Sequence, residues 1–167
     1  MSYFKHTSMN KAYLLIGGNM GDRLANLENA KKAIEKDLGK ILCTSSIYET
    51  AAWGIEDQPA FLNQALYIET KLDAKDLMNM LLQIEKNMGR IRLQPLGPRT
   101  IDLDIIFFND EIMNTDNLTI PHPSMQKRNF VLTPLNEIAP DFIHPVFKRS
   151  IAQLLIDCED SLLCIKK

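Results

Sequence analysis

Residues 101–108, with the sequence Ile-Asp-Leu-Asp-Ile-Ile-Phe-Phe, constrain the fold of this chain more than any other segment. Their β-branched and aromatic side chains predict a buried β-strand. Asp102 and Asp104 interrupt the apolar run, and the two-residue period of a strand places both on one face, about 7 Å apart. Two ionised carboxylates in this arrangement repel each other and are costly to desolvate, so we expect a cation beside them.

The paired acids have two interpretations. Carboxylates on one rigid strand suit Mg²⁺, which usually takes one or two protein carboxylates and completes its shell with water and phosphate. Alternatively, the acids lie on a solvated face and only keep the strand soluble. The preceding Gly97-Pro98-Arg99 and the nearby arginines favour the metal site. Arginine matches phosphate oxygens, and the combination of metal and arginine is typical of phosphoryl transfer.

Composition limits the classes of partner. The 167 residues are 46% hydrophobic and 24% charged, which predicts one soluble globular domain with a substantial core. The net charge of −2 gives no basis for binding nucleic acid or an anionic membrane. Three cysteines without metal-ligand spacing indicate a reducing, cytoplasmic compartment, and no apolar run is long enough for a membrane span. The basic residues gather locally, which suits a small anionic ligand: Arg90, Arg92, Arg99, Lys127 and Arg128.

The apolar patterns predict alternating strands and helices. We expect strands over residues 13–16, 41–49, 61–70 and 101–108, and a short returning strand over 111–114. Asp22 and Asp73 are expected to cap two helices, with Leu24, Leu27, Ile34 and Leu38 on the apolar face of the first and Leu77, Met80, Leu81, Ile84 and Met88 on that of the second.

Later segments are predicted to be helical and irregular. A short helical piece is expected over 124–128, a helix beginning at Thr133-Pro134, and a helix over 151–156 capped by Ser150. Gly17-Gly18 lacks the spacing of a phosphate-binding loop, and we interpret it as a tight turn with positive φ. Residues 1–10 are expected to be a disordered extension.

The order β-α-β-β-α-β predicts an α+β fold of the ferredoxin-like, split-βαβ kind. Its antiparallel sheet should carry the two main helices on one face and the later helices on the other, in three α/β/α layers. This fold hosts many functions, so it does not decide between them.

The stretch Gly97-Pro98-Arg99-Thr100-Ile101-Asp102-Leu103-Asp104-Ile105-Ile106 closely resembles the signature of the 6-hydroxymethyl-7,8-dihydropterin pyrophosphokinase family of folate biosynthesis. The resemblance extends from about Ala12 to about Leu155. It implies a single pyrophosphokinase domain over residues 11–167. The implied reaction is ATP-dependent pyrophosphoryl transfer to the hydroxymethyl oxygen of the pterin, with release of AMP. ATP as co-substrate, two Mg²⁺ ions and a monomeric enzyme are expected, without nucleic-acid or membrane partners.

The resemblance also implies roles for individual residues. Asp102 and Asp104 would hold the metal ions, and Phe61 and Phe130 would clamp the pterin ring while Asn63 pairs with its edge. Arg90 and Arg92 would belong to a mobile loop that closes over the nucleotide. The catalytic set is Arg90, Arg92 and Arg99. The ATP-binding set is Glu85, Arg92, Arg99, Ile105, His122 and Arg128. The pterin-binding set is Thr50, Ala51, Trp53, Phe61, Asn63, Asp102 and Phe130.

The chain departs from the family pattern in two places. Pro95-Leu96 stands where well-known members carry Arg-Trp, and this loop is one residue shorter. Phe61 lacks the hydroxyl of the commoner tyrosine. Trp53 could instead cover the core, and His122 could be a surface histidine in a rigid turn.

Two other functions remain open on the sequence. One is a different Mg²⁺-dependent nucleotidyl- or phosphotransferase on a ferredoxin-like sheet; a nucleotidyltransferase would release pyrophosphate. The other is a binding module for RNA or a small ligand, against which the paired acids and the negative net charge count.

Overall fold

The fold is built on a six-stranded sheet in which each pairing between strands is antiparallel. The computed structural model describes residues 8–52, 57–91 and 95–167. The sheet has the order β5-β1-β4-β3-β8, and β2 also pairs with β4. Its strands are β1 (Asn10–Gly18), β2 (Lys40–Thr44), β3 (Tyr48–Thr50), β4 (Phe61–Thr70), β5 (Asp102–Phe108) and β8 (Cys164–Lys166).

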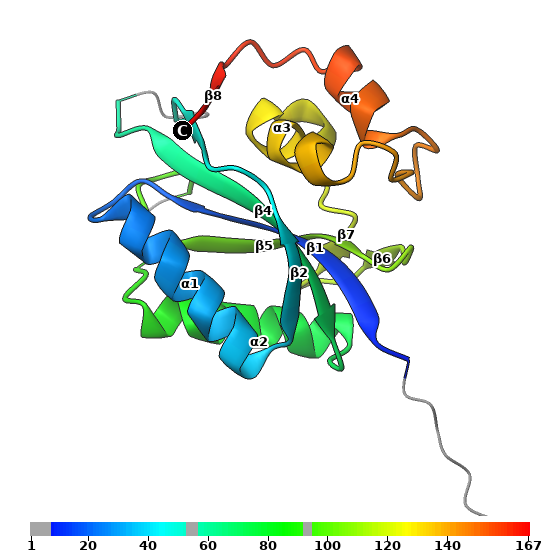
Figure 1. Ribbon diagram of the computed structural model, residues 1–167, viewed down its shortest axis with the longest axis horizontal. Coiled ribbons are helices and arrows are strands. Elements are labelled where there is room, and N and C mark those ends of the chain that lie inside the picture. Colours follow the sequence, from blue (N-terminus) through cyan, green and yellow to red (C-terminus); the bar gives the residue numbers. More distant parts are fainter. Residues whose placement is uncertain (1–7, 53–56, 92–94) are drawn as a thin grey trace, which may run out of the picture.

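Helices cover both faces of this sheet (Figure 1). They are α1 (Arg23–Asp37), α2 (Ala74–Asn87), α3 (Asn129–Ile138) and α4 (Ile151–Asp157), and a short 3₁₀ helix, η1, covers Met125–Lys127. A separate hairpin pairs β6 (Met113–Asn114) with β7 (Thr119–Ile120). Within the described ranges, no helix combines the length and apolar character that crossing a bilayer requires.

Alternate residues of β1 pack into two hydrophobic cores on opposite faces of the sheet. Leu14 and Ile16 pack in the cluster that includes the apolar faces of α1 and α2. Leu15 belongs to the opposite cluster, with Leu132 of α3 and Ile151 of α4. Figure 1 shows the same division, with α1 and α2 on one side of the sheet and α3 and α4 on the other. This alternation follows from the two-residue period of a strand buried on both faces.

The acidic residues of β5 share the face that α3 and α4 cover further along. Asp102 and Asp104 are half-buried and alternate with the buried Leu103 and Ile105, which point into the α1/α2 core. The prediction that both carboxylates share one face of a strand is therefore confirmed. The expectation of a central strand is wrong, because β5 lies at the end of the sheet order, next to β1. A β-bulge follows: Leu14 is opposite Ile105 whereas Tyr13 is opposite Phe107, so an extra residue changes the alternation after the acids.

Local capping signals in the sequence are confirmed. The Asp22 carboxylate accepts a hydrogen bond from the Ala25 backbone N–H at 3.0 Å, and Asp73 accepts from Asp76 N at 2.8 Å. Ser150 forms a capping box with Gln153 at the start of α4. These bonds satisfy backbone donors that the first turn of a helix leaves unpaired.

Several boundaries predicted from the sequence are wrong. Residues 41–49 form two strands rather than one, because Ser45 leaves the ladder and its hydroxyl accepts a hydrogen bond from Ala65 N. Leu24 is 55% exposed and lies off the apolar face of α1. Met113–Asn114 pairs with β7 instead of returning along β5. Helix α3 begins at Asn129, so Pro134 lies inside it rather than in its first turn.

Gly17-Gly18 is part of β1, not a tight turn with positive φ. A Cβ added at Gly18 would lie 2.3 Å from the Thr100 carbonyl oxygen, and one at Gly17 would lie 2.1 Å from Asn63 Oδ1. The glycines are thus required for close approach by neighbouring segments. At the other end of β1, Asn10 pairs with Thr70, so the expected disordered extension does not reach it; residues 1–7 lie outside the described ranges.

The buried His144 predicts a pH dependence of stability. Its Nδ1 accepts hydrogen bonds from Val146 N and Phe147 N at 3.1 Å, and burial lowers its pKa. Because the unfolded chain binds the proton more readily, His144 should stabilise the fold above about pH 6.5 and lose that contribution as the pH falls. The substitution His144→Asn retains an acceptor without the titrating group. As the pH falls from 7.5 to 5.5, we expect the free energy of unfolding of His144→Asn to rise relative to that of wild type.

Urea unfolding of both proteins at several pH values measures this difference. The carboxylates common to both cancel in the comparison. His122→Asn makes the same replacement at another histidine whose pKa is lowered, and it serves as a second instance for comparison with His144→Asn. A His144→Asn difference that stays constant with pH would show that His144 does not contribute.

Candidate active site

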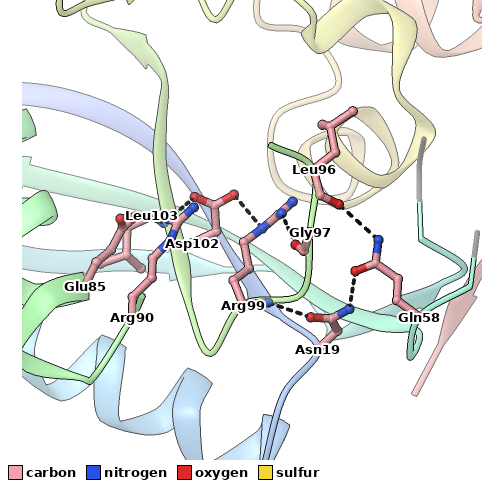
Figure 2. A network of polar contacts seen from close by, with 9 residues as sticks. All are labelled: Asn19, Gln58, Glu85, Arg90, Leu96, Gly97, Arg99, Asp102 and Leu103. Atoms are coloured by element: carbon pink, nitrogen blue, oxygen red, sulfur yellow. Dashed lines mark hydrogen bonds and ion pairs between the residues drawn. The ribbon is translucent and has the colours of Figure 1, made fainter. Parts of the chain in front are cut away.

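Asp102 lies at the centre of a charged network (Figure 2). Arg90 Nη1 donates to Asp102 Oδ1 at 2.7 Å and to both carboxylate oxygens of Glu85, at 2.5 and 2.8 Å. Arg99 Nε lies 3.2 Å from Asp102 Oδ2. Glu85 is only 3% exposed and also accepts from Leu103 N at 3.1 Å, which ties α2 to β5. The network thus joins α2, the segment that precedes β5 and the start of β5 itself.

Arg90 is anchored in this network, whereas the sequence suggested a position on a mobile loop. It lies three residues beyond the end of α2, and its backbone N–H donates to the Glu85 carbonyl oxygen at 3.1 Å. Burial opposes the charge of Arg90, but Asp102 and Glu85 outweigh it and raise its pKa. Arg90 is therefore a fixed cation in this structure.

A second set of hydrogen bonds holds Arg99 (Figure 2). The Asn19 side chain accepts from Arg99 N at 2.9 Å, and Asn19 N donates to the Arg99 carbonyl oxygen at 3.0 Å. The amide of Asn19 also donates to Gln58 Oε1, and Gln58 Nε2 donates to Leu96 O, each at 3.0 Å. The end of β1 thereby fixes the segment that leads into β5.

The same arrangement makes the ionised form of Asp104 unfavourable. Burial, followed by the nearby charges of Asp102 and Glu85, raises the pKa of Asp104 to about 8, against the opposing effect of Arg90 and Arg99. In the described part of the chain Asp104 forms no ion pair, and no group of three or more His, Cys, Asp or Glu could hold a metal by itself. Two carboxylates fit Mg²⁺ that shares its shell with water and phosphate.

The predicted pterin-binding residues surround one cavity. It is lined by Thr50, Ala51, Phe61, Asn63, Asp102 and Phe130, together with Leu15, Gly17, Leu96, Arg99, Asp104 and Arg128. Thus the predicted pterin residues within the described ranges all meet here. The described residues give the Asn63 amide no hydrogen-bond partner, which leaves it available to a ligand.

This cavity is partly filled by the protein itself. The Arg99 guanidinium lies over the Phe61 ring at 4.7 Å from its centre, and that of Arg128 lies 5.8 Å from the centre of the Phe130 ring. The cavity volume is about 40 Å³, well below the roughly 300–1,000 Å³ of typical ligand pockets. A flat heterocycle therefore requires side chains such as Arg99 to move.

The predicted ATP-binding residues are distributed over several places. Ile105 and His122 line a larger second cavity of about 620 Å³, between α2 and the β6/β7 hairpin. Arg99 and Arg128 line the first cavity, and Glu85 is enclosed in the charged network. Asp104 lines both cavities and is therefore the point at which two ligands could meet.

His122 is neutral at physiological pH. Burial, with a further effect of Arg128, lowers its pKa to about 4. Its Nδ1 accepts from Ser124 N at 3.2 Å, so the neutral ring carries its proton on Nε2. His122 can therefore offer a neutral N–H donor to the second cavity.

Two predicted residues, Arg92 and Trp53, lie outside the described ranges. Other site residues were missed from the sequence. Asn19 and Gln58 connect the site loops, and Gly17 leaves room for Asn63. The signal available for Asn19 and Gly17 was the Gly-Gly-Asn ending of a buried strand, which we interpreted as a turn.

Comparison with known proteins places the chain in a family. A family model described as 7,8-dihydro-6-hydroxymethylpterin-pyrophosphokinase (HPPK) matches residues 13–140. The chain belongs to the HPPK family. A 2-amino-4-hydroxy-6-hydroxymethyldihydropteridine pyrophosphokinase of Aquifex aeolicus is 39% identical over 145 residues, which are 87% of this chain and 90% of that protein. The HPPK family therefore accounts for most of the chain.

Some relatives are much longer. The folic acid synthesis protein FOL1 of Dictyostelium discoideum is 46% identical over 136 residues, and the match covers 81% of this chain but 20% of that protein. A crystal structure of Plasmodium falciparum HPPK-DHPS has a TM-score of 0.75 at 20% identity, covering 89% of this chain and 44% of that one. At this identity the structural likeness shows the HPPK-type fold alone.

The crowded carboxylates predict that Asp104→Asn separates ligand binding from folding. The substitution replaces a carboxyl group whose ionised form is unfavourably placed, so the metal-free variant should be at least as stable as wild type. Mg²⁺ with a non-hydrolysable ATP analogue should raise the Tm of wild type and have little effect on the variant. Thermal unfolding with these ligands or with EDTA measures both effects. Asp116→Asn is the control, since the exposed Asp116 lines the second cavity but not the first. An Asp104→Asn protein with wild-type stabilisation would exclude Asp104 as a ligand.

Proposed function

We propose that the chain catalyses pyrophosphoryl transfer from ATP to 6-hydroxymethyl-7,8-dihydropterin, releasing AMP. Membership of the HPPK family supports the reaction. The observation that carries the assignment to this site is the position of Asp104, which lines both the cavity of the predicted clamp rings and the larger second cavity. A pterin in the first and a nucleotide in the second would meet at the paired acids.

The residues can be given distinct tasks. Phe61 and Phe130 hold the heterocycle by its faces, and Asn63 offers its edge both a donor and an acceptor. Ile105 contacts the nucleotide, and His122 donates its Nε2–H to it. Arg90 and Arg99, which bond Asp102 in the ligand-free site, balance charge on the transferred phosphates. Thr50 and Ala51 complete the pterin pocket, and Glu85 orients Arg90.

Asp102 and Asp104 are the residues that would hold Mg²⁺, as two ions according to the family pattern. When bound, the metal supplies charge neutralisation to the ATP phosphates. The hydroxymethyl oxygen attacks the β-phosphorus and loses its proton to solvent, and the bond from that phosphorus to the bridging oxygen of the α-phosphate breaks as AMP leaves with that oxygen. Positioning and charge balance account for most of the catalysis in such transfers.

Finer features are part of the same proposal. The sheet order β5-β1-β4, with β2 and β3 both on β4, supports a ferredoxin-like split βαβ arrangement in three layers. A single pyrophosphokinase domain over residues 11–167 is consistent with the two cores that share this sheet. A monomer is sufficient, because one chain supplies both cavities. The free cysteines suit the cytoplasm.

The nucleotide product tests the proposed reaction. With ATP, Mg²⁺ and the hydroxymethyl-dihydropterin, we expect AMP and a pterin diphosphate, both resolved by ³¹P NMR. Formation of ADP, pyrophosphate or no product in a folded, metal-loaded protein would contradict the proposal. Pterin without a hydroxymethyl group is the control substrate and should give no AMP.

The clamp rings predict a selective loss of pterin affinity. Phe61→Ala or Phe130→Ala should weaken pterin binding by roughly 1–3 kcal/mol, the scale of stacking between a base and an aromatic side chain. Calorimetry should show ATP affinity nearly unchanged. If ATP binding fell while pterin binding stayed the same, the two cavities would be assigned the wrong way round.

A further inference from the structure

Helix α3 has no N-terminal capping side chain of its own. Arg128 occupies its N-cap position and forms no side-chain capping bond. The acceptor comes instead from a distant segment, because Asp160 Oδ2 accepts a hydrogen bond from Asn129 N at 2.9 Å. A carboxylate at this place satisfies a free backbone donor and also interacts favourably with the helix dipole.

Asp160 is itself fixed by further bonds. Its Oδ1 accepts from Leu162 N at 3.0 Å, and its carbonyl oxygen accepts from Asn129 Nδ2 at 2.5 Å. Asn129 Nδ2 also lies 3.4 Å from the Leu162 carbonyl oxygen. The backbone and the side chain of Asn129 thus both donate hydrogen bonds to residues 160–162, and these bonds fix the position of the cap.

The capped turn carries two side chains of the pterin cavity. Phe130 is the second residue of α3, and Arg128 immediately precedes the helix. Burial lowers the pKa of Arg128, and Asp160 is one of the acidic groups that oppose this effect. Loss of Asp160 would therefore loosen the backbone under Phe130 and remove a charge that favours Arg128 as a cation.

The same segment reaches a further lining residue of the cavity, Thr50. Beyond Leu162 the chain enters β8, in which Cys164 is the register partner of Thr50 at the end of β3. Thr50 lines the pterin cavity. Residues 160–166 therefore contact the elements that carry both Thr50 and Phe130, and they lie beyond residue 140, where the match to the family model ends.

We propose that Asp160 is a positioning residue for pterin binding, acting through the first turn of α3 and not by contact with substrate. This inference rests on the proposed function of the cavity. It assigns to a residue outside the matched family region the task of holding Phe130 and Arg128 in place.

The test compares three variants of the full chain. Asp160→Ala removes the cap, Asp160→Asn retains an oxygen that can accept from Asn129 N, and Glu159→Ala removes the neighbouring exposed acid. Pterin affinity is measured by calorimetry in the presence of Mg²⁺ and a non-hydrolysable ATP analogue.

We expect Asp160→Ala to raise the pterin Kd roughly 5- to 30-fold, the scale of a lost helix cap. Asp160→Asn should recover most of the affinity, and Glu159→Ala should match wild type. The Kd of the ATP analogue should rise less than that of the pterin, since Phe130 lines the first cavity and not the second, although Arg128 also influences His122 in the second.

Hydrogen exchange without ligands provides an independent readout. Amides of residues 129–132 should exchange faster in Asp160→Ala than in wild type, and near wild-type rates should return in Asp160→Asn. This result is expected even if the wild-type protein binds no pterin, so failure of the proposed function can be distinguished from failure of the cap. An unchanged pterin Kd in Asp160→Ala, or an equal loss of pterin and ATP affinity, would overturn the positioning role. Unchanged exchange at the start of α3 would overturn the cap itself.

Discussion

The shared bond of Arg90 to Glu85 and Asp102 is the interaction on which this site depends. It holds the end of α2 against the first residue of β5 and gives Asp102 a cation in the ligand-free protein. Asp104, two residues further on the same face, has no such ion pair within the described ranges, and burial together with the charges of Asp102 and Glu85 raises its pKa. The network therefore leaves one carboxylate electrostatically unsatisfied, which is the condition a bound cation relieves.

The rest of the fold serves to bring separate segments up to this pair of acids. The two glycines that end β1 allow the backbone at Thr100 and the Asn63 amide to approach more closely than any side chain would permit. Asn19 then connects the segment before β5 to Gln58. Two cores on opposite faces of one sheet keep β1, β4 and β5 rigid beneath these contacts. The site is thus assembled from strand ends that share a well-packed support.

The parts of the structure that could be predicted from the sequence are those determined by residues close to one another in the chain. The alternation in residues 101–108 predicted the face of Asp102 and Asp104, and Asp22 and Asp73 marked helix starts because a cap acts three residues away. The start of α3 could not be found in this way, since its cap comes from Asp160, 31 residues later. The fixed position of Arg90 likewise depends in part on the Asp102 carboxylate of another element, β5. Gly17-Gly18 was misinterpreted because crowding by Asn63 and Thr100 is a tertiary effect.

In the proposed mechanism Asp102 and Asp104 together hold the metal between a nucleotide and a pterin. A crystal structure with Mn²⁺, a non-hydrolysable ATP analogue and the hydroxymethyl-dihydropterin tests it directly, because anomalous scattering locates the metal. We predict metal density within coordination distance of oxygens from both carboxylates, with the nucleotide against Ile105 and His122 and the pterin between Phe61 and Phe130. Metal bound away from both carboxylates, or a pterin outside the cavity of the two rings, would contradict the account.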